Sequence, residues 1–214
     1  MKLFKTILNI IAIASILLLP YAGIIPSFGY SIPILVIVWF ALKYSNESFA
    51  DIGFSLKHFE PKSILIGAVV AALTLFFMQL AFLPGIELIA SLEYKDSGLT
   101  DTIQEGPVQY LVMVVFGWLI GGIYEEIVFH GFIFTRLEKM IQGKYAIHTS
   151  FVITAILFGA YHYVLGPLGI INAFLIGNVY LALYLYFKRN LWYPIMCHGF
   201  YNMMVMTLIY FDYL

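Results

Sequence analysis

The sequence has few charged residues and a single cysteine, and each scarcity excludes a class of protein. Asp, Glu, Lys and Arg make up 11% of the 214 residues, whereas 62% are hydrophobic. A soluble domain carries about a quarter charged residues, so this chain could not cover a globular surface with polar groups. Cys197 stands alone, which excludes an internal disulfide and zinc sites built on paired cysteines. The net charge of −1 argues against a nucleic-acid partner, which would require a basic surface.

Long apolar stretches are abundant instead, and they predict an all-α, polytopic membrane protein. A helix needs about 20 residues to cross the hydrocarbon core of a bilayer. Open strands cannot satisfy their backbone groups in lipid, so the crossings must be helical. We expect one membrane domain over residues 1–214, a bundle of about seven transmembrane helices whose main partner is the lipid bilayer. The expected spans are 4–23, 31–45, 63–85, 107–136, 147–164, 168–187 and 191–211.

The distribution of basic residues orients this bundle. With the N-terminus inside, ten of the eleven Lys and Arg residues lie in inner segments, and only Lys95 lies outside. This agrees with the positive-inside rule. The stretch 107–136 is longer than one crossing requires, so we expect it to be tilted, or broken near Gly121 and Gly122. Splitting it into two spans would reverse the membrane orientation of every later segment, and the chain would no longer agree with the positive-inside rule. The termini are therefore expected on opposite sides of a cell membrane.

Ionisable residues inside the expected spans are the best candidates for chemistry. A charge at the centre of a membrane helix costs at least roughly 2.5–3.5 kcal/mol, so such residues are rarely retained without a use. Glu125 and Glu126 lie inside the fourth span, and His130 follows them. His162 lies late in the fifth span, and His198 lies in the first half of the seventh. These residues predict one polar centre within the membrane.

Helical spacing divides these residues into faces. Glu126 and His130 are four residues apart and share one face of their helix. His198 and Asn202 share a face by the same rule. Glu125 points about 100° away from Glu126, so the two carboxylates cannot both face one small cavity squarely. We expect one glutamate to do chemistry and the other to brace the site, with His130 as the natural partner if Glu126 is the brace.

Depth within the membrane sets His162 apart from the other candidates. On the expected boundaries, Glu125 and His198 lie well inside their spans, whereas His162 lies near the outer end of its own. At ~1.5 Å per helical residue, the mismatch in height amounts to about 10 Å. A tilted helix, or a span that continues past Tyr163, would be needed to bring His162 to the others.

Three short motifs carry the candidate residues, each within a hydrophobic span. In order along the chain they are Glu125-Glu126-Ile-Val-Phe-His130, Phe158-Gly-Ala-Tyr-His162 and His198-Gly-Phe-Tyr-Asn202. They resemble the EExxxR, FxxxH and HxxxN motifs of the CPBP family, the CAAX proteases and bacteriocin-processing proteins also called Abi. Each motif alone is weak, but all three in order are specific. The resemblance covers roughly residues 107–206, which would form a CPBP-like catalytic core.

The resemblance implies an intramembrane endopeptidase that hydrolyses a peptide bond of a membrane-associated peptide or protein. By position, Glu125 matches the family's general base, and His162 matches the residue that holds and polarises the attacking water. His198 and Asn202 match the pair that stabilises the oxyanion. Two donors one helical turn apart are well suited to bracket a developing negative charge.

Supporting roles fall to the remaining motif residues, which are Glu126, His130 and Phe158. His130 is a departure, because the family's first motif usually ends in arginine. Arginine is always charged and would pair permanently with a neighbouring glutamate. Histidine gains and loses its proton near neutral pH, so the sequence predicts a pH-sensitive pair with Glu126.

The resemblance leaves the use of a metal open, because the family has been described both as metalloproteases and as metal-independent glutamate proteases. A metal, if present, would be held by Glu125, His162 and His198, and zinc would suit that set. The HExxH motif is absent, which favours a metal-free mechanism. No cofactor is therefore assigned.

Two other functions stay open at this point. One is a non-catalytic membrane scaffold or regulator of the same family. The other is a proton-coupled transporter in which Glu125, Glu126 and His130 form a relay, although no internal repeat supports it. Within the family, prenylated CAAX tails are the eukaryotic substrates. The short chain favours a prokaryotic plasma membrane, where bacteriocin processing or immunity and peptide pheromones are the alternatives.

Overall fold

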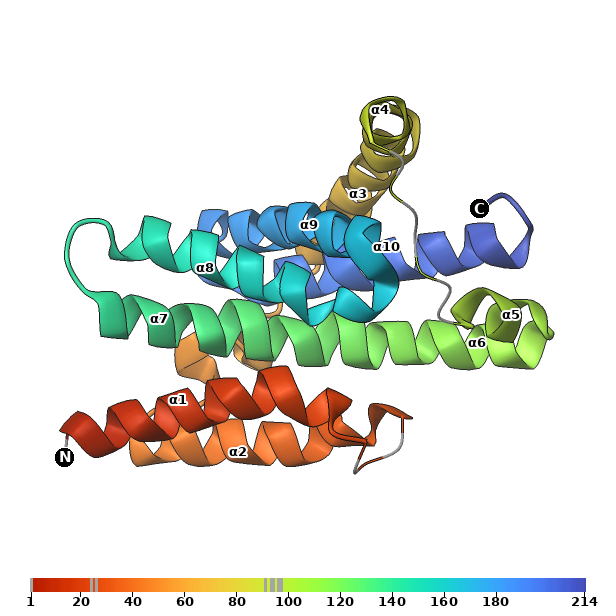
Figure 1. The fold of residues 1–214 in the computed structure, drawn as a ribbon. Helices are drawn as coiled ribbons and strands as arrows, with labels where there is room; N and C mark the ends of the chain where they lie inside the picture. The colour runs from red at the N-terminus through yellow and green to blue at the C-terminus, as the bar shows by residue number, and fades with distance from the viewer. Residues whose placement is uncertain (1, 24, 26, 91, 93–94, 96–97) are drawn as a thin grey trace.

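The computed structural model describes residues 2–23, 25, 27–90, 92, 95 and 98–214, and the regular structure in these residues is helical (Figure 1). This confirms the all-α class. The helices are α1 (Lys2–Leu18), α2 (Ser31–Tyr44), α3 (Lys62–Phe77), η5 (Met78–Phe82), α4 (Leu83–Ile89), α5 (Leu99–Gln104), α6 (Pro107–Phe116), η6 (Gly117–Ile133), α7 (Phe134–Ile141), α8 (Ala146–Tyr161), α9 (Gly166–Tyr186) and α10 (Trp192–Tyr210). Short 3₁₀ turns lie between them: η1 (Leu19–Tyr21), η2 (Ser27–Tyr30), η3 (Phe49–Ile52), η4 (Leu56–His58) and η7 (Tyr163–Leu165).

Each of the seven ranges expected from the sequence contains a helix. Four helices in the described part of the chain are long and apolar enough to cross a membrane: Phe4–Tyr21, Lys62–Ile86, Pro107–Ile141 and Tyr163–Tyr186. The helices Phe28–Tyr44 and Ala146–Tyr161 are apolar but shorter. The chain is therefore a multi-pass helical protein, while the number seven and the inside N-terminus stay predictions. The two termini lie at opposite ends of the bundle (Figure 1).

The fourth expected span forms one helix of 35 residues, Pro107–Ile141, which runs along the whole bundle (Figure 1). The break expected near Gly121 and Gly122 is therefore wrong. These glycines permit close packing, because a side-chain carbon at Gly122 would lie 3.3 Å from the backbone oxygen of Ile195 in α10. The middle of this helix, η6, has the wide turns of a π-helix, which are frequent at functional sites.

The long helix separates two groups of helices. α1 and α2 pack against each other on one side, and α8, α9 and α10 lie on the other (Figure 1). α10 contacts both η6 and α3, and α9 contacts α8. Side chains of η6 such as Phe129 and Phe132 are fully buried, whereas Leu73 and Phe76 of α3 are largely exposed. The polar residues of η6 therefore lie inside the bundle, and the outer faces are suited to lipid.

Candidate active site

Two consecutive carboxylates of η6 lie in the interior and point to different partners. The exposed fraction is 8% for Glu125 and 0% for Glu126. Glu126 points toward His130 of its own helix and toward one ring nitrogen of His198 in α10. Glu125 points toward the other ring nitrogen of His198 and toward His162, which follows α8. The ring of His198 therefore lies between the two carboxylates.

Both oxygens of Glu126 are used by histidines. Its Oε2 lies 2.6 Å from Nδ1 of His130, and its Oε1 lies 2.8 Å from Nδ1 of His198. Because a carboxylate can only accept, each histidine donates an Nδ1–H. Nε2 of His198 is then the nitrogen that faces the Glu125 side. Glu126 thus sets the orientation and the tautomer of His198, as a carboxylate does for a histidine in many hydrolase sites.

Glu125 makes longer approaches to two histidines. Its Oε2 lies 3.8 Å from Nε2 of His162 and 3.9 Å from Nε2 of His198. These separations are too long for direct hydrogen bonds, which end at about 3.2 Å. A single water oxygen about 2.8 Å from each atom would fill such a gap. One carboxylate oxygen therefore lies within 4 Å of a ring nitrogen from each of two histidines.

His162 lies at the level of Glu125, so the expected 10 Å mismatch in height is wrong. α8 has 16 residues and runs back along the long helix from a short turn. Glu125 precedes that turn by about as many residues as His162 follows it. The sequence estimate failed because it ended the fourth span at residue 136, whereas the helix continues to Ile141 and so places Glu125 further from the turn. Nδ1 of His162 lies 2.8 Å from the Phe158 carbonyl oxygen and donates to it, which leaves Nε2 as an acceptor.

Asn202 lies beside His198, where one helical turn of α10 places it. Its Nδ2 donates to the carbonyl oxygen of Gly117 over 3.2 Å. A side-chain carbon at Gly121 would clash with this Nδ2 and would lie 3.1 Å from Nε2 of His198. Gly121 therefore gives both nitrogens room at one place, and the structure brings the expected oxyanion pair together.

Aromatic rings enclose the histidines. Phe158 packs against His130, with 5.2 Å between ring centroids, and against His162, with 4.8 Å. Tyr180 of α9 was not expected at the centre, but its ring stacks on His198 with centroids 4.4 Å apart. The one signal for it was its position in the middle of a span, because tyrosines of membrane helices gather at the interfaces.

The spacing of the glutamate and histidine side chains bears on whether they could hold a metal. Within the residues that the structure describes, no group of three or more His, Cys, Asp or Glu side chains is arranged to hold a metal ion. Zinc ligands about 2.0–2.1 Å from the metal lie roughly 3.3 Å apart in a tetrahedral site. The distances of 3.8 and 3.9 Å from Glu125 are longer than that, so these side chains as placed do not fit a tetrahedral zinc ion.

Fold and site together define a multi-pass helical membrane protein with a buried glutamate–histidine centre. Residues 107–204 match the family model described as type II CAAX prenyl endopeptidase Rce1-like. This segment is similar to the Rce1-like family of CAAX proteases, which confirms the resemblance carried by the three motifs. The family supports a membrane endopeptidase. The match begins with α6, ends within α10 and contains every residue of the centre. No curated protein and no solved structure matches the chain.

Proposed function

We propose that the chain is an intramembrane endopeptidase in which Glu125 activates a water molecule to hydrolyse a peptide bond of a membrane-associated peptide or protein. The observation that carries this proposal is the convergence of Glu125 Oε2 with the Nε2 atoms of His162 and His198, at 3.8 and 3.9 Å. A general base must reach the proton it removes directly or through one water. A water held between these atoms would be the nucleophile.

In the first step, the water donates one hydrogen bond to Glu125 and the other to Nε2 of His162. The second bond is available because His162 donates its only proton to the Phe158 carbonyl. Glu125 takes a proton as the water oxygen bonds to the peptide carbonyl carbon. The same proton then passes to the amide nitrogen, the C–N bond breaks, and an acid and an amine leave.

Charge that develops on the carbonyl oxygen would be met by His198 and Asn202. His198 keeps its Nδ1–H on Glu126, so its Nε2 donates only when the ring carries a second proton. The negative charge of Glu126 on the far side of the ring stabilises that imidazolium. Asn202 has a second N–H on Nδ2 besides the one donated to Gly117. Donors aimed at an oxyanion contribute several kcal/mol in a water-excluded site, about 2.7–4 for a single donor.

The transporter alternative is not favoured by this geometry. A relay through Glu126 and His130 needs a further group to receive the proton. Nε2 of His130 is buried and has no hydrogen-bond partner in the part of the chain that the structure describes. The relay would end there. The scaffold alternative differs from the protease in one measurable respect, since a scaffold does not depend on the carboxylate of Glu125.

The deciding experiment compares the purified full chain with its Glu125→Gln variant on a panel of fluorogenic, membrane-anchored peptides. We expect the variant to lose about 10²–10⁴-fold in kcat/KM, the usual contribution of a general base. Glu105→Gln is the matched control, because Glu105 is exposed and lies outside the centre. A chelator added to the wild type tests the metal directly. Cleavage by Glu125→Gln at the wild-type rate would refute the proposed role.

A further inference from the structure

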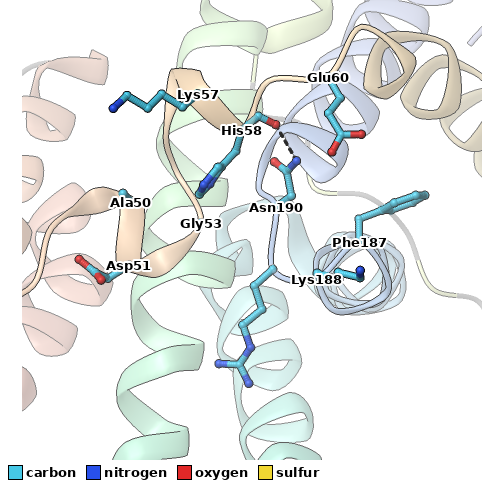
Figure 2. A pocket seen from close by; sticks show the side chains of 10 residues that line it. Ala50, Asp51, Gly53, Lys57, His58, Glu60, Phe187, Lys188 and Asn190 are labelled. Atoms are coloured by element: carbon cyan, nitrogen blue, oxygen red, sulfur yellow. Dashed lines mark hydrogen bonds between the residues drawn. The ribbon is translucent and has the colours of Figure 1, made fainter.

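A polar pocket lies where α9 ends and α10 begins, opposite the loop that follows α2 (Figure 2). Its volume is about 470 Å³, within the range of small-ligand pockets, about 300–1,000 Å³. It shares no residue with the glutamate–histidine centre. The polar residues that line it include Asp51, Lys57, His58, Glu60, Lys188 and Asn190.

The two walls of this pocket are tied together, so the pocket is preformed. Three hydrogen bonds join them: Leu191 N to Gly53 O at 3.1 Å, Asn190 Nδ2 to His58 O at 2.7 Å, and Trp192 Nε1 to Ser55 O at 2.8 Å. Figure 2 shows the bond between Asn190 and His58. Gly53 has a φ of 94°, and any side chain there would clash with the carbonyl oxygen of Arg189. Only glycine allows this close contact between the walls.

The acidic residues of the pocket already have partners. Glu60 forms an ion pair with Lys62 at 2.6 Å and accepts a hydrogen bond from the Tyr193 hydroxyl at 2.9 Å. Asp51 accepts hydrogen bonds from the backbone N and the Oγ of Ser48, at 2.8 and 2.7 Å. Most of the hydrogen bonds and ion pairs of these carboxylates are made to neighbours outside the cavity, although Glu60 also attracts Lys188 within it.

The basic residues divide into one that is paired and three that are not. Arg189 donates two hydrogen bonds to Glu138, at 2.7 and 2.8 Å. The side chains of Lys57, His58 and Lys188 make no hydrogen bond or ion pair with any residue that the structure describes. The ring of His58 turns into the space between Gly53 and Asn190 (Figure 2). The groups left for a ligand are thus cationic or hydrogen-bond donors.

Exposed apolar residues flank these basic residues in both walls. Leu56 and Phe59 surround Lys57 and His58 and are 80% and 38% exposed. Tyr186, 80% exposed, precedes Lys188 by two residues. Apolar and aromatic side chains interleaved with lysines are typical of the membrane–water interface. The pocket also lies in segments that the distribution of Lys and Arg assigns to the inner surface, where anionic lipids attract them.

We propose that this pocket binds a phosphate ester, presented by an anionic lipid headgroup of the inner leaflet. Lys57 and Lys188 would contact the phosphate oxygens, and His58 would donate from its ring. The flanking apolar residues favour a lipid over a soluble phosphate compound, because they would place the pocket at headgroup depth. The proposal is independent of the catalytic role of Glu125.

The test measures binding of dioctanoylphosphatidylglycerol to the full chain by native mass spectrometry or by the shift in thermal unfolding. Dioctanoylphosphatidylcholine and glycerol 3-phosphate are the comparison ligands. The variant is K57Q/K188Q, and the matched control is K43Q/K144Q, which removes the same charge from segments expected at the same surface. We expect about 25-fold weaker binding in K57Q/K188Q, roughly fivefold for each lysine that contacts the phosphate. The control should stay within about twofold of the wild type, since only a general surface field is reduced.

Each outcome bears on one part of the proposal. Equal losses in the two variants would overturn it, because the effect would then be general surface charge. Binding of phosphatidylcholine as tight as that of phosphatidylglycerol would also overturn it. Binding of glycerol 3-phosphate as tight as that of the lipid would support the phosphate site but overturn the lipid as its source. Equal thermal stability of both variants without added ligand would verify that they fold. None of these readouts uses proteolysis. A negative result for lipid binding would therefore not bear on the proposed protease activity.

Discussion

Two carboxylates, one buried in the middle of the bundle and one half-buried at its end, are paired in different ways. In the middle, Glu126 accepts from two histidines, His130 and His198, at 2.6 and 2.8 Å. At the end of the bundle, Glu47 accepts from Arg136 and from a lysine. Arginine and lysine keep their charge at neutral pH, so the contact of Glu47 with Arg136, called here the outer pair, can only stabilise the fold. Histidine exchanges protons near neutral pH, so Glu126 with His130 and His198, called here the inner cluster, can take part in chemistry.

Among the changes that separate these two regions, we expect the largest effect from Glu126→Gln, which breaks the inner cluster of Glu126, His130 and His198. The amide can accept from one histidine, but its NH₂ group would face the Nδ1–H of the other. His198 would then lose its fixed orientation, and we expect kcat/KM to fall by about 100-fold, the low end of general acid–base contributions. The loss should appear in kcat rather than in KM, measured on the same fluorogenic peptides. Activity within twofold of the wild type would show that Glu126 does not brace the site.

The outer pair should behave in the opposite way when Glu47 is replaced by Gln. Arg136, with a side chain 2% exposed, would lose its anionic partner. We expect the free energy of unfolding to fall by about 1.5–3 kcal/mol, the usual value of a hydrogen bond to a charged group. Activity per folded molecule should not change. Thermal unfolding in detergent and cleavage rates at low temperature would measure the two quantities, and a large drop in kcat would contradict the division between the regions.

The outer pair also predicts a pH dependence of stability. Burial acts to raise the pKa of Glu47, but hydrogen bonds from Lys139 and Arg136 outweigh it and hold the pKa below the ordinary 4.5. A carboxyl with a lowered folded pKa stabilises the fold fully above its unfolded pKa, and this stabilisation is lost as the pH falls through the folded value. The stability difference between wild type and Glu47→Gln should therefore be constant near neutral pH and shrink below about pH 4.5. Unfolding curves at a series of pH values measure this difference, and a difference that grows in acid would contradict it.

The smallest effect is expected at Tyr180, next to the inner cluster. Its hydroxyl is buried without a hydrogen-bond partner among the described residues, while its ring stacks on His198. Tyr180→Phe removes the unpaired hydroxyl and keeps the ring, so stability should stay within about 1 kcal/mol of the wild type or rise slightly. We expect kcat/KM to change by less than about threefold. A loss of tenfold or more would indicate that the hydroxyl contacts the substrate.

The spacing of residues along one helix correctly predicted part of the glutamate–histidine centre. Glu126 and His130 were expected on one helical face, and they are in hydrogen-bond contact. The separation of Glu125 from Glu126 was also expected, because neighbouring residues of a helix point in different directions. Such relations hold within one helix and do not depend on how helices pack.

Contacts between different helices were much harder to predict from the sequence. The height of His162 was misjudged, and the bridge from Glu126 to His198 was not foreseen. Both depend on where α8 and α10 cross the long helix, which small residues such as Gly121 and Gly122 permit. A pattern of apolar residues fixes the face of a helix in lipid but not its height relative to a neighbour. Tyr180 was missed for the same reason, since its contact with His198 is made between α9 and α10.

The sequence by itself determined that the chain is a helical membrane protein, which residues are expensive to bury, and which family they resemble. These follow from composition, from the length of a membrane crossing and from fixed spacing along a helix. Only the tertiary structure decided that Glu125 faces two Nε2 atoms while Glu126 holds the opposite side of His198. It also decided that the loop after α2 meets the turn before α10 to form a basic pocket. Contacts between distant segments depend on helix heights and crossing angles, and these are set by side-chain packing across the whole bundle.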